Sequence, residues 1–381
     1  MNNKRVFVLG AGSSIGHSQQ CSPSADFPNA PHIFPSINEF FEKAKELDLR
    51  SSHRFDRITQ YAKRWFGWDV WKKKKVDIEE LFTHIEIELE RGRSPELLEV
   101  RQEILSLIKE ILSRLAEPIL GQGGECGLFQ RTEILSDTDT IVNFNWDLLL
   151  DHLLGRETLL MRWYENGSLG THHVKQYFNF LLRLSAFGEQ TSAHGGIENP
   201  YTTWDGSAGY YLKMHGSIDW FYCSNERCRG AGKVFPVLKL DESHKCAECH
   251  EPLEALVIPP VLNKAYRQYP LIRRIWNIAS QELRVANELI IWGYSLPSTD
   301  FHTSWLLRQA REAPLRKVSI VNPEVDKPSA KSIRRFTELF HDKVAGNQIF
   351  LYRSFGDYSE DKPVGTVDSW RSGGTASHSE A

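Results

Sequence analysis

Residues 5–16 read RVFVLGAGSSIG, a short apolar run that leads directly into glycines. A run of this length ending at Gly10 is typical of a buried strand that delivers a glycine turn. Gly10 and Gly12 permit the backbone to approach a pyrophosphate closely. The third glycine, Gly16, comes one residue too late for the dehydrogenase pattern G-x-G-x-x-G. The stretch therefore predicts a dinucleotide-binding turn unlike that of a standard dehydrogenase, with a tight structural turn as the alternative.

A second motif, NFNWD at residues 143–147, follows the apolar run DTIV at 139–142. Ligands of open α/β sheets gather at the carboxyl ends of strands, and this motif alternates polar residues with aromatic ones. In the alternative interpretation, Asp147 caps a helix expected over 148–154, while Asn145 bonds the loop backbone. The motif alone does not separate a binding site from a helix cap.

A third motif, HG at 215–216, lies in the run LKMHGSIDW at 212–220. The glycine allows a sharp change of chain direction. If His215 faces the ribose of a bound dinucleotide, the near-neutral pKa of histidine suits proton transfer from a hydroxyl. A histidine with a purely structural place is the alternative.

Four of the six cysteines lie within 27 positions, whereas Cys21 and Cys126 are isolated. Two pairs spaced C-x4-C and C-x2-C, with 17 residues between them, are typical of a zinc ribbon whose first pair is widened. A closed four-thiolate site leaves no coordination position for a substrate, so the metal would stabilise a small lobe. His244 and His250 are alternative ligands. The predicted ligands of a structural Zn²⁺ are Cys223, Cys228, Cys246 and Cys249.

Alternating strand and helix patterns predict an α/β fold with a Rossmann-like, mostly parallel sheet. We expect one catalytic domain over 1–355, with a helical insertion at 36–135 and a zinc-ribbon-like lobe at 217–257. Residues 17–35 lack periodicity and predict a long loop. Residues 356–381 are rich in Ser, Gly and charge and predict a disordered tail. Further strands are predicted at 288–292, 317–321 and 348–352.

The chain has 381 residues, of which 41% are hydrophobic and 25% charged, and its net charge is −3. This composition is typical of a folded protein and gives no reason to expect nucleic acid as a partner. No apolar segment suits a signal peptide or a membrane span, so we expect a cytoplasmic protein with reduced cysteines. Trp65, Trp68 and Trp71 are three apart and precede four lysines at 72–75. This spacing favours core packing of one helix face over base stacking by exposed indoles.

In combination, these motifs resemble the sirtuin-like superfamily, specifically a divergent bacterial branch found in anti-phage defence. Residues 291–300, IWGYSLPSTD, resemble that branch's version of the sirtuin Gly-Thr-Ser segment. The VNP at 321–323 resembles the strand-end asparagine that contacts the adenosine ribose. The resemblance extends over roughly residues 4–325, closely at the motifs and loosely through the helical insertion. It implies NAD as the substrate.

By position, the resemblance implies a role for each motif. Asp26-Phe27 is similar to the family's Asp-Phe-Arg, but it comes late and lacks the arginine. Asn145 and Asp147 fall at the family's ribose-contacting pair, and His215 falls at its catalytic histidine. The implied NAD-binding residues are Gly10, Ala11, Gly12 and Ser14 at the phosphates, Asp26 and Phe27 in the following loop, and Gly293, Ser295 and Asn322 at the adenosine half.

Two departures from the family bear on the predicted activity. Deacylating sirtuins pair a Phe-Gly-Glu strand with the substrate peptide, whereas this chain has Pro259-Pro260, which lack backbone donors. Phe144 replaces the family's glutamine. We therefore predict an NAD hydrolase that releases nicotinamide and ADP-ribose, with an NAD-dependent protein-lysine deacylase and a non-catalytic NAD or ADP-ribose sensor as alternatives. The resemblance also implies a role in anti-phage defence, with a second copy or a defence-system protein as partner; the lack of a long apolar segment predicts no membrane partner.

Overall fold

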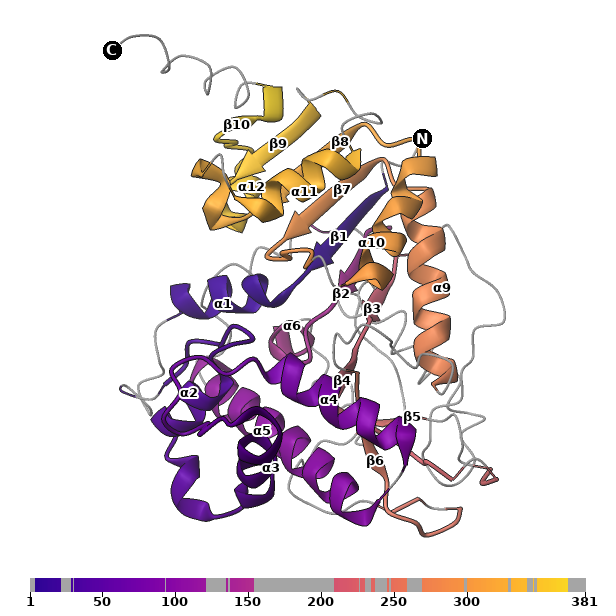
Figure 1. The fold of residues 1–381 in the computed structure, drawn as a ribbon. Helices are drawn as coiled ribbons and strands as arrows, with labels where there is room; N and C mark the ends of the chain where they lie inside the picture. Colours follow the sequence, from indigo (N-terminus) through magenta and orange to yellow (C-terminus); the bar gives the residue numbers. More distant parts are fainter. Residues whose placement is uncertain are drawn as a thin grey trace, which may run out of the picture.

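The central feature of the fold is a seven-stranded, mostly parallel sheet (Figure 1). Its strand order is β10-β9-β8-β7-β1-β2-β3. The computed structural model describes residues 4–21, 29, 31–92, 94–120, 135, 138–153, 209–225, 227–229, 234–236, 245–246, 248–258, 269–297, 300–327, 330–340, 345 and 348–368.

The strands form where short apolar runs are followed by turn residues, as expected for strands buried on both faces. β1 is central and pairs in parallel with β2 on one side and β7 on the other. At one edge, β10 runs antiparallel to β9. The strands of this sheet are β1 (Arg5–Leu9), β2 (Thr140–Asn143), β3 (Tyr211–Lys213), β7 (Glu288–Trp292), β8 (Lys317–Val321), β9 (Ile349–Tyr352) and β10 (Gly365–Thr366).

The order of the strands along the chain reverses at β1. From β1 the chain adds β2 and β3 on one side, and then crosses to add β7, β8 and β9 on the other. This is the Rossmann order 3-2-1-4-5-6, in which ligands bind outside the carboxyl ends of the strands at the reversal. The predicted mostly parallel α/β sheet is confirmed, and the carboxyl ends of β1 and β7 mark the expected site.

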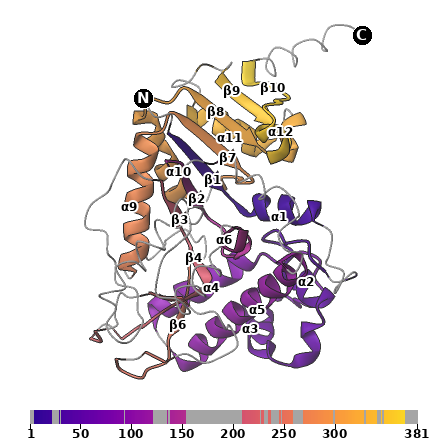
Figure 2. The ribbon, with the colours of Figure 1, turned by 180° about the vertical axis from the view of Figure 1, so that it is seen from behind.

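Between α1 and β2 the chain forms a group of helices beyond the carboxyl ends of the strands (Figures 1 and 2). The long helix α5 contacts α2, α3 and α4, so it forms the spine of this group. The helices lie within the predicted insertion at 36–135, of which residues 121–134 are outside the described part. They are α2 (Phe40–Glu46), the 3-10 helix η1 (Leu49–Ser52), α3 (Asp56–Phe66), α4 (Ile78–Arg91) and α5 (Pro95–Leu120).

Local sequence sets the ends of these helices. The Asp77 carboxylate accepts two backbone N–H groups of the first turn of α4, and the Ser94 hydroxyl accepts one at the start of α5. Gly67 ends α3 in the left-handed conformation, with φ at 65°. Trp68 and Trp71 therefore lie beyond the helix, which differs from the predicted single helix face.

After β3 the chain passes directly into a second, three-stranded antiparallel sheet of order β5-β4-β6. Its strands are β4 (Gly216–Tyr222), β5 (Val234–Pro236) and β6 (Glu254–Val257), in the region predicted as the zinc-ribbon-like lobe. Within the described ranges, the remaining helices are α1 (Ala11–Gln20), α6 (Leu149–Leu153), α9 (Pro270–Arg284), α10 (Phe301–Arg308), η5 (Gln309–Glu312), η6 (Pro323–Asp326), α11 (Lys331–Phe340) and α12 (Phe355–Ser359).

The chain forms ordered elements where composition predicted a disordered tail over 356–381. Ser354 begins α12 through a capping box. The Phe355 ring stacks on Trp292, with centroids 4.1 Å apart and planes 10° apart, and β10 then extends the sheet. Burial of aromatic rings outweighs the polar composition here, and the prediction is corrected as far as residue 368. Residues 369–381 lie outside the described part.

The helix α1 continues through residues 17–20, where a loop was predicted. His17 and Ser18 are both fully buried, and the Ser18 hydroxyl accepts the Phe34 N–H at 3.1 Å, so burial holds these polar residues in the helix. Cys21 follows α1 and is disulfide-bonded. The expectation that the cysteines are all reduced is therefore wrong for Cys21.

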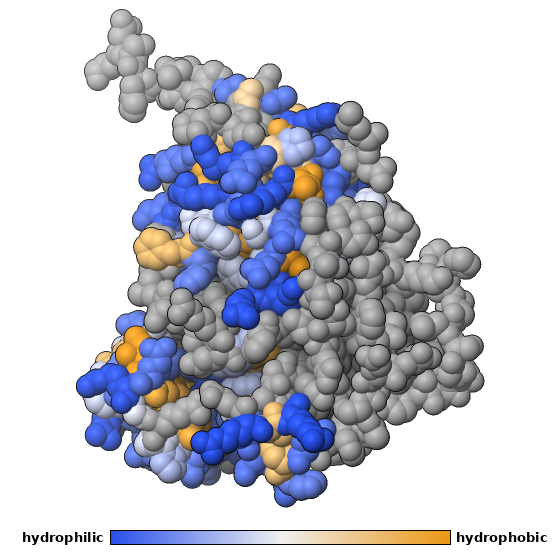
Figure 3. Space-filling view, turned by 90° about the vertical axis from the view of Figure 1, so that its right-hand side faces the viewer, coloured by the Kyte–Doolittle hydropathy of each residue, from blue (hydrophilic) through white to orange (hydrophobic). Residues whose placement is uncertain are grey.

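Much of the described surface on the face drawn in Figure 3 is hydrophilic. On the face drawn in Figure 3, hydrophobic residues are scattered in small groups among hydrophilic ones. Large apolar side chains that stand exposed include Trp65, Ile87, Phe301 and Trp305. Among the helices of the described residues, none is long and apolar enough to cross a membrane.

Candidate functional site

The parallel strands bring the predicted site residues to one edge of the sheet. Gly10 follows β1 directly, Asn145 lies two residues beyond β2, and His215 lies two residues beyond β3. Gly293 and Asn322 directly follow β7 and β8. Since parallel strands all end at the same edge, the sheet assembles motifs that are far apart in the sequence.

The turns after β1 and β7 pack against each other through glycines. The Gly10 N–H donates to the Trp292 carbonyl (3.0 Å), and the Gly12 N–H donates to the Gly293 carbonyl (2.9 Å). A Cβ atom on Gly12 would lie 2.8 Å from the Gly293 Cα. Gly293 has φ at 65°, and a Cβ atom there would lie 2.1 Å from the Ser13 nitrogen. The tight structural turn foreseen as the alternative is therefore present, and the Gly12 N–H is already bonded within the protein.

The first turn of α1 provides the outward part of the glycine loop. Ala11 is exposed, whereas the Ser14 side chain is buried. No acidic residue lies in this turn. The N-terminus of a helix favours anions, because its free N–H groups and its dipole both present positive charge. An anion at this loop would therefore meet the backbone near Ala11, and the Ser14 hydroxyl faces the protein.

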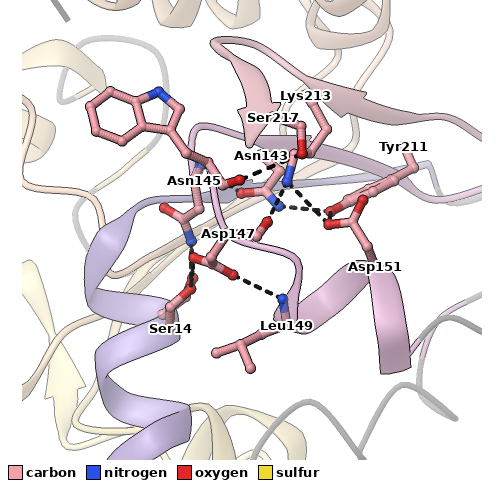
Figure 4. Close-up of polar contacts among 11 residues, drawn as sticks. Ser14, Asn143, Asn145, Asp147, Leu149, Asp151, Tyr211, Lys213 and Ser217 are labelled. Atoms are coloured by element: carbon pink, nitrogen blue, oxygen red, sulfur yellow. Dashed lines mark hydrogen bonds and ion pairs between the residues drawn. The ribbon is translucent and has the colours of Figure 1, made fainter. Parts of the chain in front are cut away.

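A buried hydrogen-bond network joins the first motif to the second (Figure 4). The Ser14 hydroxyl donates to Asp147 Oδ2 at 2.8 Å, and the Ser13 hydroxyl donates to the Gly10 carbonyl at 2.8 Å. The Asn145 amide nitrogen donates to both serine hydroxyls at 3.0 Å. Residues at the ends of β1 and β2 thus form one polar cluster.

This network fixes the orientation of the Asn145 amide. Each serine hydroxyl has one proton, which it donates elsewhere, so each can only accept from Asn145. The nitrogen of the amide must therefore face Ser13 and Ser14. Figure 4 shows the amide oxygen turned away from Ser14, where it remains an acceptor.

Asp147 combines the two roles that the sequence left open. Its Oδ1 accepts the Leu149 N–H at 3.0 Å, as a helix cap does, while its Oδ2 accepts the Ser14 hydroxyl. Burial raises the pKa of Asp147 above its ordinary value, against the opposing effects of the Lys213 charge and the Ser14 hydrogen bond. The carboxyl group is therefore both a structural cap and a part of the site cluster.

Three further polar residues that the sequence did not single out, Tyr211, Lys213 and Asp151, support this segment together with Asn143 of the motif (Figure 4). Lys213 donates to the Asp147 carbonyl at 2.5 Å and pairs with Asp151 at 3.1 Å. The Tyr211 hydroxyl donates to Asp151 at 3.0 Å and accepts from the Asn143 amide nitrogen at 2.9 Å. The Asn143 amide oxygen in turn accepts the backbone N–H of residue 145.

The sequence contains a sign of this network. Lys213 stands in the apolar run before the third motif, and Asp151 interrupts the apolar residues of α6. Both side chains are almost fully buried, with 1% and 2% exposed. A buried charge needs a partner, so a lysine and an aspartate in two apolar segments predict an ion pair between them.

His215 is buried among aromatic rings. Its ring lies edge-on to Phe144 with centroids 5.1 Å apart, and within 27° of parallel to Trp276 at 6.3 Å. The His215 carbonyl accepts the Ile258 N–H at 2.9 Å. Phe144 also contacts Tyr294 after β7, with centroids 4.8 Å apart. An aromatic layer therefore adjoins His215 on the side of the second motif.

The backbone after His215 turns through Gly216. Its φ is 72°, and a Cβ atom would lie 2.0 Å from the Leu256 carbonyl oxygen. Only glycine fits this contact between β4 and β6. The third motif is thus fixed to the small sheet.

The remaining predicted NAD-binding residues are more dispersed. Ser295 is exposed beyond β7. The Asn322 side chain accepts the Glu324 N–H at 2.8 Å and caps a short helix after β8. Asp26 and Phe27 lie outside the described residues.

The four predicted metal ligands come together beside β4 and β6. Their sulfur atoms all lie within 4.8 Å of one another, and two Sγ pairs are 3.6 Å apart. A tetrahedron of thiolates at about 2.3 Å from zinc has sulfurs about 3.8 Å apart, so this cluster fits a structural Zn²⁺. The residues are Cys223, Cys228, Cys246 and Cys249.

The local backbone also suits a thiolate site. Burial opposes ionisation of Cys246, but backbone N–H donors from Cys249 and Glu248 and hydrogen bonds from the Cys228 and Cys223 thiols together outweigh it and lower its pKa to about 7. The alternative ligand His250 is exposed and held at φ 60°, while His244 lies outside the described residues. The four cysteines suffice for a closed site.

Comparisons with known proteins find only distant structural similarity. No family model and no curated protein match the chain. It is similar to the solved structure of a mutant Sir2 homologue in complex with ADP-ribose, with 11% identity, a TM-score of 0.35, and coverage of 99% of this chain and 95% of that one. It is also similar to a Sir2 homologue in complex with NAD, with 14% identity, a TM-score of 0.33, and coverage of 75% and 81%. At these scores, function has to be inferred from the residues of this chain.

Proposed function

We propose that this protein is an NAD hydrolase that cleaves the bond between nicotinamide and ribose, giving nicotinamide, ADP-ribose and a proton. The observation that carries the proposal is the joining of Asn145 and Asp147 to Ser14 at the strand-order reversal of a Rossmann sheet. This cluster supports the proposal because an amide, a carboxyl group and a helix N-terminus lie at the sheet edge at which Rossmann folds bind dinucleotides.

Asn145 is proposed to act through its amide oxygen. The amide nitrogen is held by Ser13 and Ser14, so the oxygen has a fixed direction. A fixed acceptor can orient the attacking water or the departing carboxamide while the ribose develops oxocarbenium charge. Asp147 holds this arrangement through Ser14.

His215 is proposed to contact the ribose hydroxyls and to take up a proton. An imidazole serves as an acid or base near neutral pH. The aromatic rings of Phe144 and Trp276 hold it in place and exclude water from one side. Water in the site would weaken its electrostatic interactions by screening them.

The backbone next to the site favours hydrolysis over peptide deacylation. The Ile258 N–H donates to the His215 carbonyl at 2.9 Å, and the Ile258 carbonyl accepts the Trp146 indole N–H at 3.3 Å. A substrate peptide that adds as a strand needs open backbone groups. At Ile258 both groups are already bonded; Pro259-Pro260, which follow, lie outside the described residues.

Nicotinamide release from NAD by the full chain tests the proposal. We expect Asn145→Ala and His215→Ala each to lower turnover about 100-fold or more. His84→Ala, which removes a half-buried histidine of the insertion, serves as the matched control and should turn over like the unsubstituted protein. Unchanged turnover in both site variants would remove the proposed roles.

Two added measurements separate the alternatives. NAD consumption that requires an acetyl-lysine peptide would favour a deacylase. Tight NAD binding in calorimetry without nicotinamide release, with or without the peptide, would favour a sensor.

The biological setting is also a proposal. The motif resemblance supports a role in anti-phage defence in the cytoplasm, with a second copy or another defence protein as partner. NAD depletion measured in infected cells, with and without Asn145→Ala, tests that role.

A further inference from the structure

A second surface lies on the helical insertion. The sequence favoured core packing for its three tryptophans, but the structure separates them. Trp65 is 47% exposed near the end of α3. Trp71 is held structurally, because its indole N–H donates to the Thr59 hydroxyl at 3.0 Å and its ring packs on Phe41. Trp65 therefore has an indole surface that the fold leaves open.

Aromatic rings continue from Trp65 across the end of the helix. The His84 ring lies 5.2 Å from Trp65 and 5.1 Å from Phe66, measured between centroids. Phe66 lies 4.4 Å from Trp68. We call these four residues the aromatic strip. The Tyr61 hydroxyl contacts His84 Nδ1 at 2.8 Å and holds that ring in the strip.

Cations accompany the aromatic strip along its length. The Arg64 guanidinium lies 5.3 Å from the Trp65 ring centroid, and the Lys73 ammonium lies 3.7 Å from that of Trp68. The single acid within residues 63–75 is Asp69, which pairs with Lys72 at 3.2 Å. The segment has six exposed cations: Lys63, Arg64, Lys72, Lys73, Lys74 and Lys75.

The positive charge is concentrated in this segment and is not a property of the whole chain. The whole chain has a net charge of −3, whereas residues 63–75 have six cations and one acid. Two acids of neighbouring elements act on this region as well, Glu39 on Lys75 and Glu88 on Tyr61, but cations remain in excess, and such an excess attracts a polyanion. Phosphate groups bind to cations alone. The exposed indole of Trp65 adds a flat apolar face, on which a base can stack.

We propose that the aromatic strip and its cations bind single-stranded nucleic acid. Unpaired bases stack on aromatic faces while lysine and arginine neutralise the phosphates, and this combination is independent of base sequence. A duplex keeps its bases stacked on each other and so offers no free base to the Trp65 face, whereas an indole also enters a lipid interface, which competition by vesicles distinguishes. The proposal is independent of the NAD chemistry at the sheet edge.

The test is fluorescence anisotropy of a labelled 12-nucleotide oligothymidylate with the full chain at low salt. We expect saturable binding that weakens as salt rises, and about tenfold weaker binding for Trp65→Ala. The double variant Lys73→Ala/Lys74→Ala should bind more weakly and depend less steeply on salt. Trp305→Ala is the matched control, because Trp305 is 51% exposed on α10, and it should bind like the unsubstituted protein.

Three results would overturn the proposal: no binding by the unsubstituted chain, equal binding by Trp65→Ala, or an equal loss in Trp305→Ala. Competition by a 12-base-pair duplex or by phosphatidylserine vesicles as strong as by the unlabelled oligonucleotide would also overturn it. Circular dichroism melts verify that each variant is folded.

Discussion

Replacement of Lys213 by methionine should weaken the fold more than any surface substitution. Methionine keeps the length of the side chain but removes the charge that pairs with Asp151 and the donor to the Asp147 carbonyl. The Lys213 and Asp151 side chains are 1% and 2% exposed. Removal of one partner leaves a buried carboxylate uncompensated, which costs about 3–5 kcal/mol. We expect the free energy of unfolding to fall by about 4 kcal/mol.

A double-mutant cycle separates the ion pair from the packing of the two side chains. Asp151→Asn keeps an acceptor for the Tyr211 hydroxyl but removes the negative charge. The double variant Lys213→Met/Asp151→Asn lacks the uncompensated charge of Asp151, so we expect it to be more stable than Lys213→Met alone. The coupling energy between the two substitutions should exceed about 1 kcal/mol.

Guanidinium unfolding, followed by far-ultraviolet circular dichroism, measures each free energy. Lys362→Met is the matched control. Its ammonium pairs with Glu360 at 2.7 Å, but the two side chains are 71% and 44% exposed, so its loss should cost less than about 1 kcal/mol. A cost below about 1 kcal/mol for Lys213→Met, or additive costs in the cycle, would refute the structural role given to the buried pair.

Three further predictions concern the glycine turn, a buried histidine and the cysteine cluster. Gly12→Ala should lower stability by about 1–3 kcal/mol, because its Cβ would lie 2.8 Å from Gly293 backbone, whereas Gly92→Ala, with open space around it, should be nearly neutral in the same unfolding assay. Burial lowers the pKa of His17 to about 4 from 6.5, so the unfolded chain binds the proton more tightly and stability falls as pH drops from 6.5 to 4. The full loss is about 3 kcal/mol, and urea unfolding across this pH window should show it in the unsubstituted chain but not in His17→Gln. Metal analysis should find one zinc per chain, lost with a fall in Tm in Cys246→Ser and on chelation; zinc retained by that variant, or lost in His250→Ala, would contradict the four-cysteine site.

The large sheet could be predicted from the sequence because its strands are short apolar runs with turn residues behind them. The predicted strands at 5–9, 288–292 and 317–321 coincide with β1, β7 and β8. The elements that were missed have a different basis. β10 has two residues and exists through pairing with β9, and α12 is held by the stacking of Phe355 on Trp292. Tertiary contacts of this kind leave no periodic pattern.

The sequence indicated which residues lie together at the candidate site better than it indicated the hydrogen bonds that they form. The edge of the sheet brings together Gly10, Asn145 and His215, as strand order requires. The sequence could not reveal that the Gly12 N–H bonds Gly293, because that contact depends on how two turns approach. It also placed Ser14 at phosphate, whereas the buried hydroxyl bonds Asp147.

The short strand β3 explains why the site is built as it is. In β3 the side chains alternate, so Tyr211 and Lys213 share one face while Leu212 shares the other with Met214. Both polar side chains on the first face bond Asp151. A strand buried on both faces is ordinarily apolar on both, because a buried polar group costs free energy unless it is bonded. This strand instead keeps one polar face directly before His215 and beneath the NFNWD segment. The network is therefore best understood as the support that fixes the second motif to the third, and the short strand is the element on which the geometry of the whole site depends.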